Sequence, residues 1–185
     1  MSAGFSPLNL NERSQYDALY QMCPEKPADL SFVNLWSWQD KYKYQWKFDE
    51  DLCWLRICNK DKTEYLAPVG NWRQKNWKRR LAALKLTELS LSRVPKSLVC
   101  GLKSEIPFAA VPDRGNWEYL YKVSDLTGLK GTGYKNKRRQ LNRFLETYNY
   151  EYRPLGLREI PDLIELQRVW PVSYTHLTLP TNSRV

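Results

Sequence analysis

Apolar positions near the start of the chain follow the period of two helices. In NLNERSQYDALYQMC, residues 9–23, most apolar side chains share one helical face. Asn9 stands three residues ahead of Glu12, which is the spacing of a capping box, and Pro24 follows the last turn. The segment SFVNLWSWQDKY, residues 31–42, repeats the helical spacing after Ser31, which can cap the helix. Two consecutive helices are therefore predicted before residue 43.

The pattern then changes to strict alternation, which is typical of a half-buried strand. In KYKYQWKF, residues 41–48, aromatic side chains alternate with Lys and Gln, so we expect one buried face formed by Tyr42, Tyr44, Trp46 and Phe48. Polar turns separate this segment from LCWLRIC (52–58) and TEYLAPV (63–69). An antiparallel meander is predicted, with a hairpin over residues 42–58.

Strand-like and helix-like segments remain mixed over the rest of the chain. An amphipathic helix is predicted in residues 71–86, with its apolar stripe formed by Trp77, Leu81 and Leu84. Further strands are predicted at 89–94, 107–111, 117–123 and 150–155, and further helices at 96–106, 134–148 and 158–170. The mixture indicates an α+β fold with a mainly antiparallel central sheet flanked by helices.

Composition places the chain among folded, basic proteins. Of its 185 residues 42% are hydrophobic and 14% aromatic, and the net charge is +9. This charge favours anionic partners such as nucleic acid, phosphates or anionic lipid, without selecting among them. The sequence has no apolar run of about 18 residues, so we expect no transmembrane segment and a cytoplasmic location. The four cysteines, Cys23, Cys53, Cys58 and Cys100, form no C-x-x-C pair and are expected to be buried thiols.

The C-terminal stretch does not resemble evolved sequence. Residues 172–181, VSYTHLTLPT, have no hydrophobic period, and they back-translate to the end of a transposase-type sequencing-library adapter. We therefore interpret residues 171–185 as a non-native, adapter-derived tail. Its His176 is the only histidine of the chain, so the native part is expected to lack histidine-based nucleophile pairs and histidine-ligated metal sites.

The motif TGLKGTGYKNKRRQLNRF, residues 127–144, combines a glycine-rich turn with a basic helix. Gly128, Gly131 and Gly133 allow close backbone approach where the free amides of a helix N-terminus converge, and such places bind anions. A flexible connection between two elements is the alternative interpretation of these glycines.

The basic residues of this helix fall into two groups on a helical wheel. Lys137 and Arg138 flank an apolar stripe that is expected to face the core, formed by Tyr134, Leu141, Leu145 and Tyr148. They are candidates for binding a phosphate-bearing donor or acceptor, together with Gly131 and Gly133. Their alternative role is packing along the core edge or pairing with Glu118 or Glu146. Lys135, Arg139 and Arg143 point toward solvent.

Two blocks of the sequence together resemble a known family. LSFVNLWSWQDKYKYQW and EYLYKVSDLTGLKGTGYKNKRRQLNRF are similar to soluble bacterial proteins of unknown function, grouped with the C-terminal domain of phosphatidylglycerol lysyltransferases. In the second block the match rests on an aromatic pair, Leu-x-Gly, Tyr and a Lys-Arg-Asn-x-x-Asn-x-Phe pattern. The matching positions are Tyr119, Tyr121, Leu129, Gly131, Tyr134, Lys137, Arg138, Asn142 and Phe144. Arg139 departs from the pattern, because asparagine is usual there.

The resemblance implies two domains of the GNAT (acyl-CoA N-acyltransferase-like) type and an acyl- or aminoacyltransferase activity. The domains would be residues 1–155, an N-terminal GNAT-like domain, and residues 156–170, the start of a truncated second one. The donor would be acyl-CoA or an aminoacyl-tRNA, with no resident cofactor, and this portion is expected to be inactive alone. A non-catalytic nucleic-acid or tRNA-binding module is the alternative, favoured by the net charge and by aromatics in residues 71–80. A purely structural or regulatory domain is a third.

Overall fold

The computed structural model describes residues 4–58, 63–73, 76–84 and 90–174, the last five of these by their backbone only. The chain forms two compact units, Met1–Leu120 and Tyr121–Val185. Within the described residues no helix is long and apolar enough to cross a membrane. Most of the predicted adapter-derived tail, including His176, lies outside the described residues. Only its first residues are described, and they continue the last helix through Tyr174.

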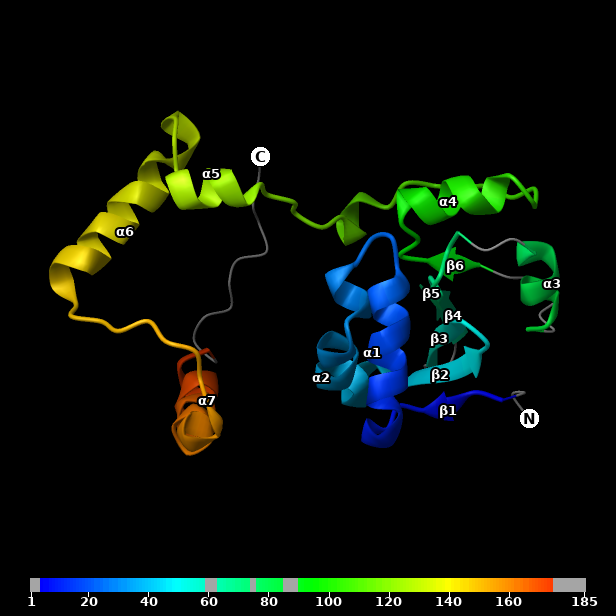
Figure 1. The fold of residues 1–185 in the computed structure, drawn as a ribbon, viewed down its shortest axis with the longest axis horizontal. Coiled ribbons are helices and arrows are strands. Elements are labelled where there is room, and N and C mark those ends of the chain that lie inside the picture. The colour runs from blue at the N-terminus through cyan, green and yellow to red at the C-terminus, as the bar shows by residue number, and fades with distance from the viewer. Residues whose placement is uncertain (1–3, 59–62, 74–75, 85–89, 175–185) are drawn as a thin grey trace. The chain divides into compact units, whose positions relative to one another are not determined.

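The first unit is built on a six-stranded, mostly antiparallel sheet (Figure 1). The order β1-β2-β3-β4-β6 runs through Ser6–Pro7, Tyr44–Asp49, Leu52–Cys58, Thr63–Leu66 and Leu91–Ser92, and β5 (Val69–Gly70) pairs with β3. Only β4 and β6 pair in parallel. The predicted hairpin is confirmed as β2 and β3, with Trp46 opposite Leu55.

Helices α1 (Arg13–Met22) and α2 (Phe32–Tyr42) cover one face of this sheet (Figure 1). The cap predicted before α1 is present, because the Asn9 side chain accepts a hydrogen bond of 3.0 Å from the Glu12 amide. The Ser31 side chain likewise accepts from the Asn34 amide over 3.4 Å at the start of α2. Each cap satisfies one of the backbone N–H groups that a helix leaves without an internal partner.

Aromatic rings form the core between these helices and the sheet. The Tyr16 ring stacks on Trp46 with centroids 5.5 Å apart, and both side chains are fully buried. Tyr44 is buried and Phe48 partly buried on the same side, as predicted. Tyr42 differs from the prediction, since it ends α2 and is not part of the strand, although its ring still contacts that of Tyr44.

The opposite face of the sheet packs against α3 (Trp77–Ala82). The buried rings of Trp54 and Trp77 meet edge to face at 6.5 Å. Trp72 is also buried, so the two tryptophans of residues 71–80 belong to the core and are not surface aromatics. The guanidinium of Arg80 joins α3 to the hairpin turn through Asp51 at 2.8 Å.

Helix α4 (Lys96–Lys103) completes the first unit and corrects one expectation about the cysteines. Its buried side chains are Leu98 and Leu102, whereas Cys100 is exposed. Cys100 is two residues from each leucine, which is about 200° around the helix, so the helical period places it on the outer face. Cys23 and Cys53 are buried as expected, and Cys58 is half-buried.

Three predicted strands are wrong, because residues 107–111, 117–122 and 150–155 have no regular structure. In the segment 117–121 the alternation is present, but Trp117, Tyr119 and Leu120 are 64%, 89% and 97% exposed. A strand exists only with a hydrogen-bonded neighbour. In the described residues this segment adds no strand to the sheet, whose members all precede residue 93.

The second unit contains helices α5 (Val123–Gly128), α6 (Lys135–Thr147) and α7 (Ile160–Tyr174). None of its described side chains is buried. The expectation that the apolar stripe of α6 faces a core is therefore wrong for the residues described, since Leu141 and Leu145 are 46% and 47% exposed. The stripe exists, but the described part of this unit places no layer over it.

Candidate anion-binding site

The glycine-rich motif forms a turn between α5 and α6 whose backbone requires glycine at one position. Helix α5 ends at Gly128, and Leu129 adopts the left-handed conformation, with its amide donating to the Asp125 carbonyl over 2.8 Å. Gly131 has φ 85° and ψ 174°, a region that is open almost only to glycine. A short 3₁₀ turn, Thr132–Tyr134, then leads into α6.

The helix N-terminus behind this turn carries no compensating negative charge from its own sequence. No side chain caps Thr132–Tyr134 or α6, and neither has an acidic residue in its first turn. The amides at the start of a helix and the helix dipole attract negative charge. A side chain at Gly131 or Gly133 would meet no other atom within 4 Å, so the turn is open on that side.

Arg138 has a contact that the sequence did not reveal. Its Nη1 donates to the main-chain carbonyl oxygens of Leu129 and Gly131, the second over 2.8 Å. One helical arginine thereby holds the turn that precedes its own helix. Glu118, one of the alternative partners considered for Arg138, accepts hydrogen bonds from the amides of Ala28 and Asp29.

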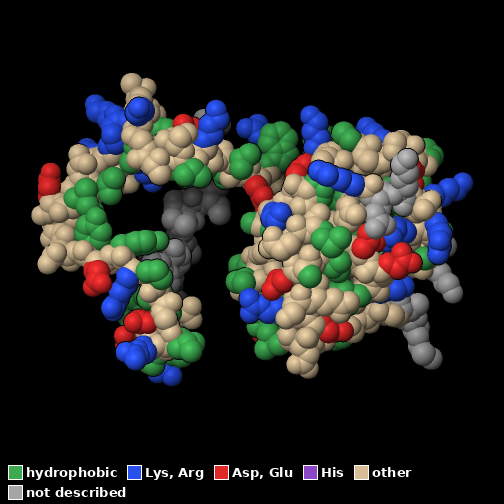
Figure 2. Space-filling model, viewed as in Figure 1, with side chains coloured by type: hydrophobic (Ala, Val, Ile, Leu, Met, Phe, Trp, Pro, Cys, Tyr) green, Lys and Arg blue, Asp and Glu red, His purple; other side chains and the backbone are tan. Residues whose placement is uncertain are grey.

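The remaining cations of the motif lie exposed around the turn. Lys137 is exposed, and so are Lys135, Arg139 and Arg143, whereas Arg138 is half-buried. Figure 2 shows Lys and Arg side chains gathered near the start of α6 and hydrophobic side chains along another side of that helix. The structure thus brings together Gly131 and Arg138 by direct contact, and it places Gly133 and Lys137 on the same short segment at the start of α6.

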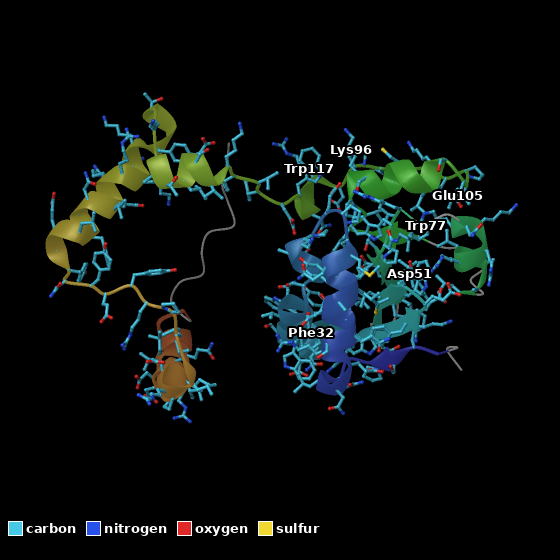
Figure 3. All side chains as sticks on the ribbon, in the orientation of Figure 1. Phe32, Asp51, Trp77, Lys96, Glu105 and Trp117 are labelled. Atoms are coloured by element: carbon cyan, nitrogen blue, oxygen red, sulfur yellow. The ribbon has the colours of Figure 1, made fainter. Side chains whose placement is uncertain are left out.

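A second concave surface lies between α3 and α4 in the first unit, and sequence reasoning did not predict it. It encloses about 550 Å³ and is lined by Trp72, Arg73, Asn76, Trp77, Gly101, Ser104 and Glu105. The Glu105 carboxylate accepts a hydrogen bond of 2.7 Å from the Trp77 amide and so caps α3; Figure 3 labels both residues. Lys78 and Arg79 line the adjoining hollow. The signal for this surface in the sequence is the basic run of residues 73–80.

Glu105 supplies the carboxylate that lines the surface between α3 and α4 and the adjoining hollow, where it accepts a hydrogen bond from the Trp77 amide. The side chains whose pKa is shifted lie in the core of the first unit. Burial raises the pKa of Tyr16 and of Cys53 well above the ordinary values, and it also raises the pKa of Cys23. These shifts favour the neutral forms, which is the usual effect of an apolar environment. Among the described residues no group of three or more Cys, His, Asp or Glu side chains could hold a metal ion.

Comparisons with known proteins agree with the α+β architecture. Residues 20–176 match the family model described as phosphatidylglycerol lysyltransferase, C-terminal. No curated protein matches the chain. A solved structure of a conserved protein of unknown function from Bacteroides thetaiotaomicron is similar, with a TM-score of 0.75 and 28% sequence identity. The match covers 98% of this chain but only 63% of that protein, so the chain spans less than two thirds of its relative.

Proposed function

The chain belongs to the phosphatidylglycerol lysyltransferase C-terminal family, whose domain is GNAT-like, and on this basis we propose that it is the N-terminal part of an acyl- or aminoacyltransferase. The substrate would carry a phosphate group, supplied by acyl-CoA or aminoacyl-tRNA as donor or by a phosphate-bearing acceptor. The proposed location is the cytoplasm. The turn between α5 and α6 is the observation that carries the binding part of this proposal.

The proposed binding residues are Gly131, Gly133, Lys137 and Arg138. The glycines give an anion access to the backbone amides, because neither carries a side chain and the space beside them is open. Lys137 adds an exposed charge. Arg138 adds a second charge and orders the turn through the carbonyls of Leu129 and Gly131. Phosphate is recognised in many proteins by this combination of helix amides and cations.

We also propose that residues 156–170 begin a second GNAT-like domain and that residues 171–185 are foreign to it. Two observations support incompleteness of the second unit. The relative of known structure is longer than this chain, which covers 63% of it. The apolar stripes of α6 and α7 are exposed, including Phe144 at 42% and Ile164 at 48%. Large exposed apolar faces mark surfaces that another layer covers.

A transfer assay tests the proposed activity. The parent protein, with its own sequence restored beyond Trp170, and residues 1–170 alone would be incubated with aminoacyl-tRNA or acyl-CoA and with amine or hydroxyl acceptors. We expect the labelled acyl group to be transferred by the parent and not by residues 1–170. Transfer by residues 1–170 would contradict the need for a second domain, and no transfer by either protein would contradict the transferase proposal.

The nucleic-acid-binding alternative has one observation in its favour, which is the basic lining of the surface between α3 and α4. Arg73, Lys78 and Arg79 line these two hollows. Base stacking, however, has no support from Trp72 or Trp77, since both rings are buried. Binding of uncharged tRNA by the parent, without turnover of any acyl donor, would favour this alternative.

A further inference from the structure

Arg56 is the only charged side chain among the described residues that is buried, with 7% of its surface exposed. It lies in the middle strand β3, where its register partners are Gln45 of β2 and Tyr65 of β4. Directly paired residues share a face of the sheet, so the three side chains form one row across it. This face is opposite to the one covered by α1 and α2, because the neighbouring pair Trp46 and Leu55 faces those helices.

The groups around Arg56 provide too few acceptors for its charge. Its Nε and Nη2 both donate to Oε1 of Gln45, over 2.9 and 2.5 Å. The Cys58 thiol lies 3.5 Å from the same oxygen and donates to it as well. A neutral amide oxygen has two lone pairs, so three donors converge on an acceptor suited to two. The Phe5 ring lies over the guanidinium, with 4.3 Å between the ring centroid and Cζ of Arg56. The ring attracts the cation without accepting a conventional hydrogen bond.

No carboxylate neutralises this guanidinium within the part of the chain that the structure describes. The ion pairs found there involve Arg13, Arg80, Arg93, Arg153 and Arg168, and none involves Arg56. A buried charge without a counter-charge is strongly unfavourable, which is why buried cations in proteins are paired. The row of Gln45, Arg56 and Tyr65 thus has the composition of an oxyanion site whose anion comes from outside the described chain.

We propose that Arg56 anchors a binding site for a small oxyanion, a carboxylate or phosphate group, on this face of the sheet, with Phe5 as its removable cover. The rim supports access, since Phe5, Gln45 and Tyr65 around the guanidinium are only half-buried. Phe5 precedes a two-residue strand, β1, that pairs with β2 only at Ser6 and Pro7. Such a short edge strand opens at low cost.

The test follows the Arg56 Nε–H resonance of the 185-residue chain by nitrogen-15 NMR while inorganic phosphate or acetate is added. The Lys137→Ala/Arg138→Ala background removes any contribution from the α5–α6 turn. We expect a saturable shift of this resonance, and tighter binding by phosphate than by acetate if the natural ligand is a phosphate group. Phe5→Ala should tighten binding, because a closed cover lowers the binding-competent fraction. Weaker binding by Phe5→Ala would contradict its role as a cover.

Two substitutions separate an anion site from a purely structural arginine. Arg56→Met keeps the length of the side chain and should weaken phosphate binding about tenfold or more, measured by phosphate-dependent thermal unfolding. The exposed Arg114→Met, which lies outside both candidate surfaces, is the matched control and should leave binding unchanged. Gln45→Glu places a carboxylate beside the guanidinium, so it should raise the unfolding temperature without phosphate and abolish the effect of phosphate.

Two results would overturn the proposal. The first is an Arg56 Nε–H resonance that does not respond to either anion. The second is a phosphate-dependent stabilisation of Gln45→Glu equal to that of the unsubstituted chain, since the introduced carboxylate and the phosphate would then not compete. The Gln45→Glu result decides the question even if Arg56→Met fails to fold.

Discussion

Arg138 donates a hydrogen bond of 2.8 Å from Nη1 to the main-chain oxygen of Gly131, so helix α6 holds the turn from which it starts. The same nitrogen also donates to the oxygen of Leu129. The turn carries a left-handed non-glycine residue, Leu129, which costs conformational energy, and it carries Gly131 at a positive φ that other residues disfavour. An arginine that satisfies two carbonyls helps to hold this conformation, and its charge stays near the exposed amides.

Replacing Lys137 or Arg138 by Ala should weaken binding of a phosphate-bearing ligand more than replacing Lys135, Arg139 or Arg143. A charge-assisted contact contributes about 1.5–3 kcal/mol where desolvated, against at most about 1 kcal/mol for an exposed charge. Coenzyme A or pyrophosphate would be titrated into the five single variants of the parent protein at two salt concentrations. Equal losses at all five positions that vanish at high salt would mean a diffuse electrostatic surface.

Gly131→Ala and Gly133→Ala should differ although both positions are open. Gly131 has φ 85°, which a side chain disfavours by about 1–2 kcal/mol, whereas Gly133 lies in the 3₁₀ turn without a positive φ. We expect Gly131→Ala to lower the affinity for pyrophosphate about five- to tenfold by shifting the turn, and Gly133→Ala to lower it less, through the added methyl group alone. Calorimetric titration of both variants checks this, and equal affinities would contradict the role of the Gly131 conformation.

Gly70→Ala should destabilise the first unit by about 2 kcal/mol or more. Gly70 has φ 141°, and an added Cβ would lie 2.1 Å from the main-chain oxygen of Asp51. Strain of this kind is among the few mechanisms that give large losses from one substitution. The movement needed to relieve it would also disturb the contact of the Gly70 amide with the Cys23 sulfur, now 3.2 Å. Urea unfolding followed by tryptophan fluorescence measures the loss, with Gly133→Ala as the control.

The stability of the first unit should be full at neutral pH and fall as the pH rises above about 9. Burial raises the pKa of Tyr16, Cys53 and Cys23, so the unfolded chain releases these protons at a lower pH than the folded chain. The ordinary values are about 8.5 for Cys and about 10 for Tyr, and above them unfolding is favoured by deprotonation of the unfolded chain. Urea unfolding at pH 7.5, 9 and 10.5 should show the decline.

The variant Tyr16→Phe separates the contribution of the tyrosine to this loss of stability from that of the cysteines. It removes a phenol whose proton the unfolded chain releases at a lower pH than the folded chain, and also the hydrogen bond of 2.6 Å from the hydroxyl to the Leu30 carbonyl. We expect a loss of about 1–3 kcal/mol at pH 7.5, because a buried carbonyl loses its partner, and a shallower decline between pH 9 and 10.5. An unchanged slope would mean that the Tyr16 proton does not contribute.

The apolar stripe of α6 should bind a hydrophobic dye in the 185-residue chain but not in the restored parent. Leu141, Phe144 and Leu145 are between 42% and 47% exposed, and a covering layer in the parent would remove them from solvent. Leu141→Glu/Leu145→Glu should reduce dye fluorescence in the 185-residue chain without changing the unfolding of the first unit. Equal fluorescence of chain and parent would contradict a covering domain.

The elements that the sequence predicted well depend on local interactions. The caps at Asn9 and Ser31 involve residues three positions apart, and the hairpin β2–β3 needs only alternation and a short polar turn. The same local information placed Gly131 before a basic helix. Backbone hydrogen bonds and side-chain periodicity over a few residues contain everything that these predictions require.

The features that the sequence did not predict were decided by tertiary structure, because they depend on partners that are distant in sequence. Periodicity identified the apolar sides of residues 117–123 and of α6, yet it could not say whether a neighbouring strand or layer would be present to cover them. The burial of Arg56 results from the register of three strands and from Phe5, which lies far from it in the chain. The sequence by itself determined which residues are apolar, basic or conformationally free, whereas only the packing of separate segments determined which of them are buried, paired or exposed.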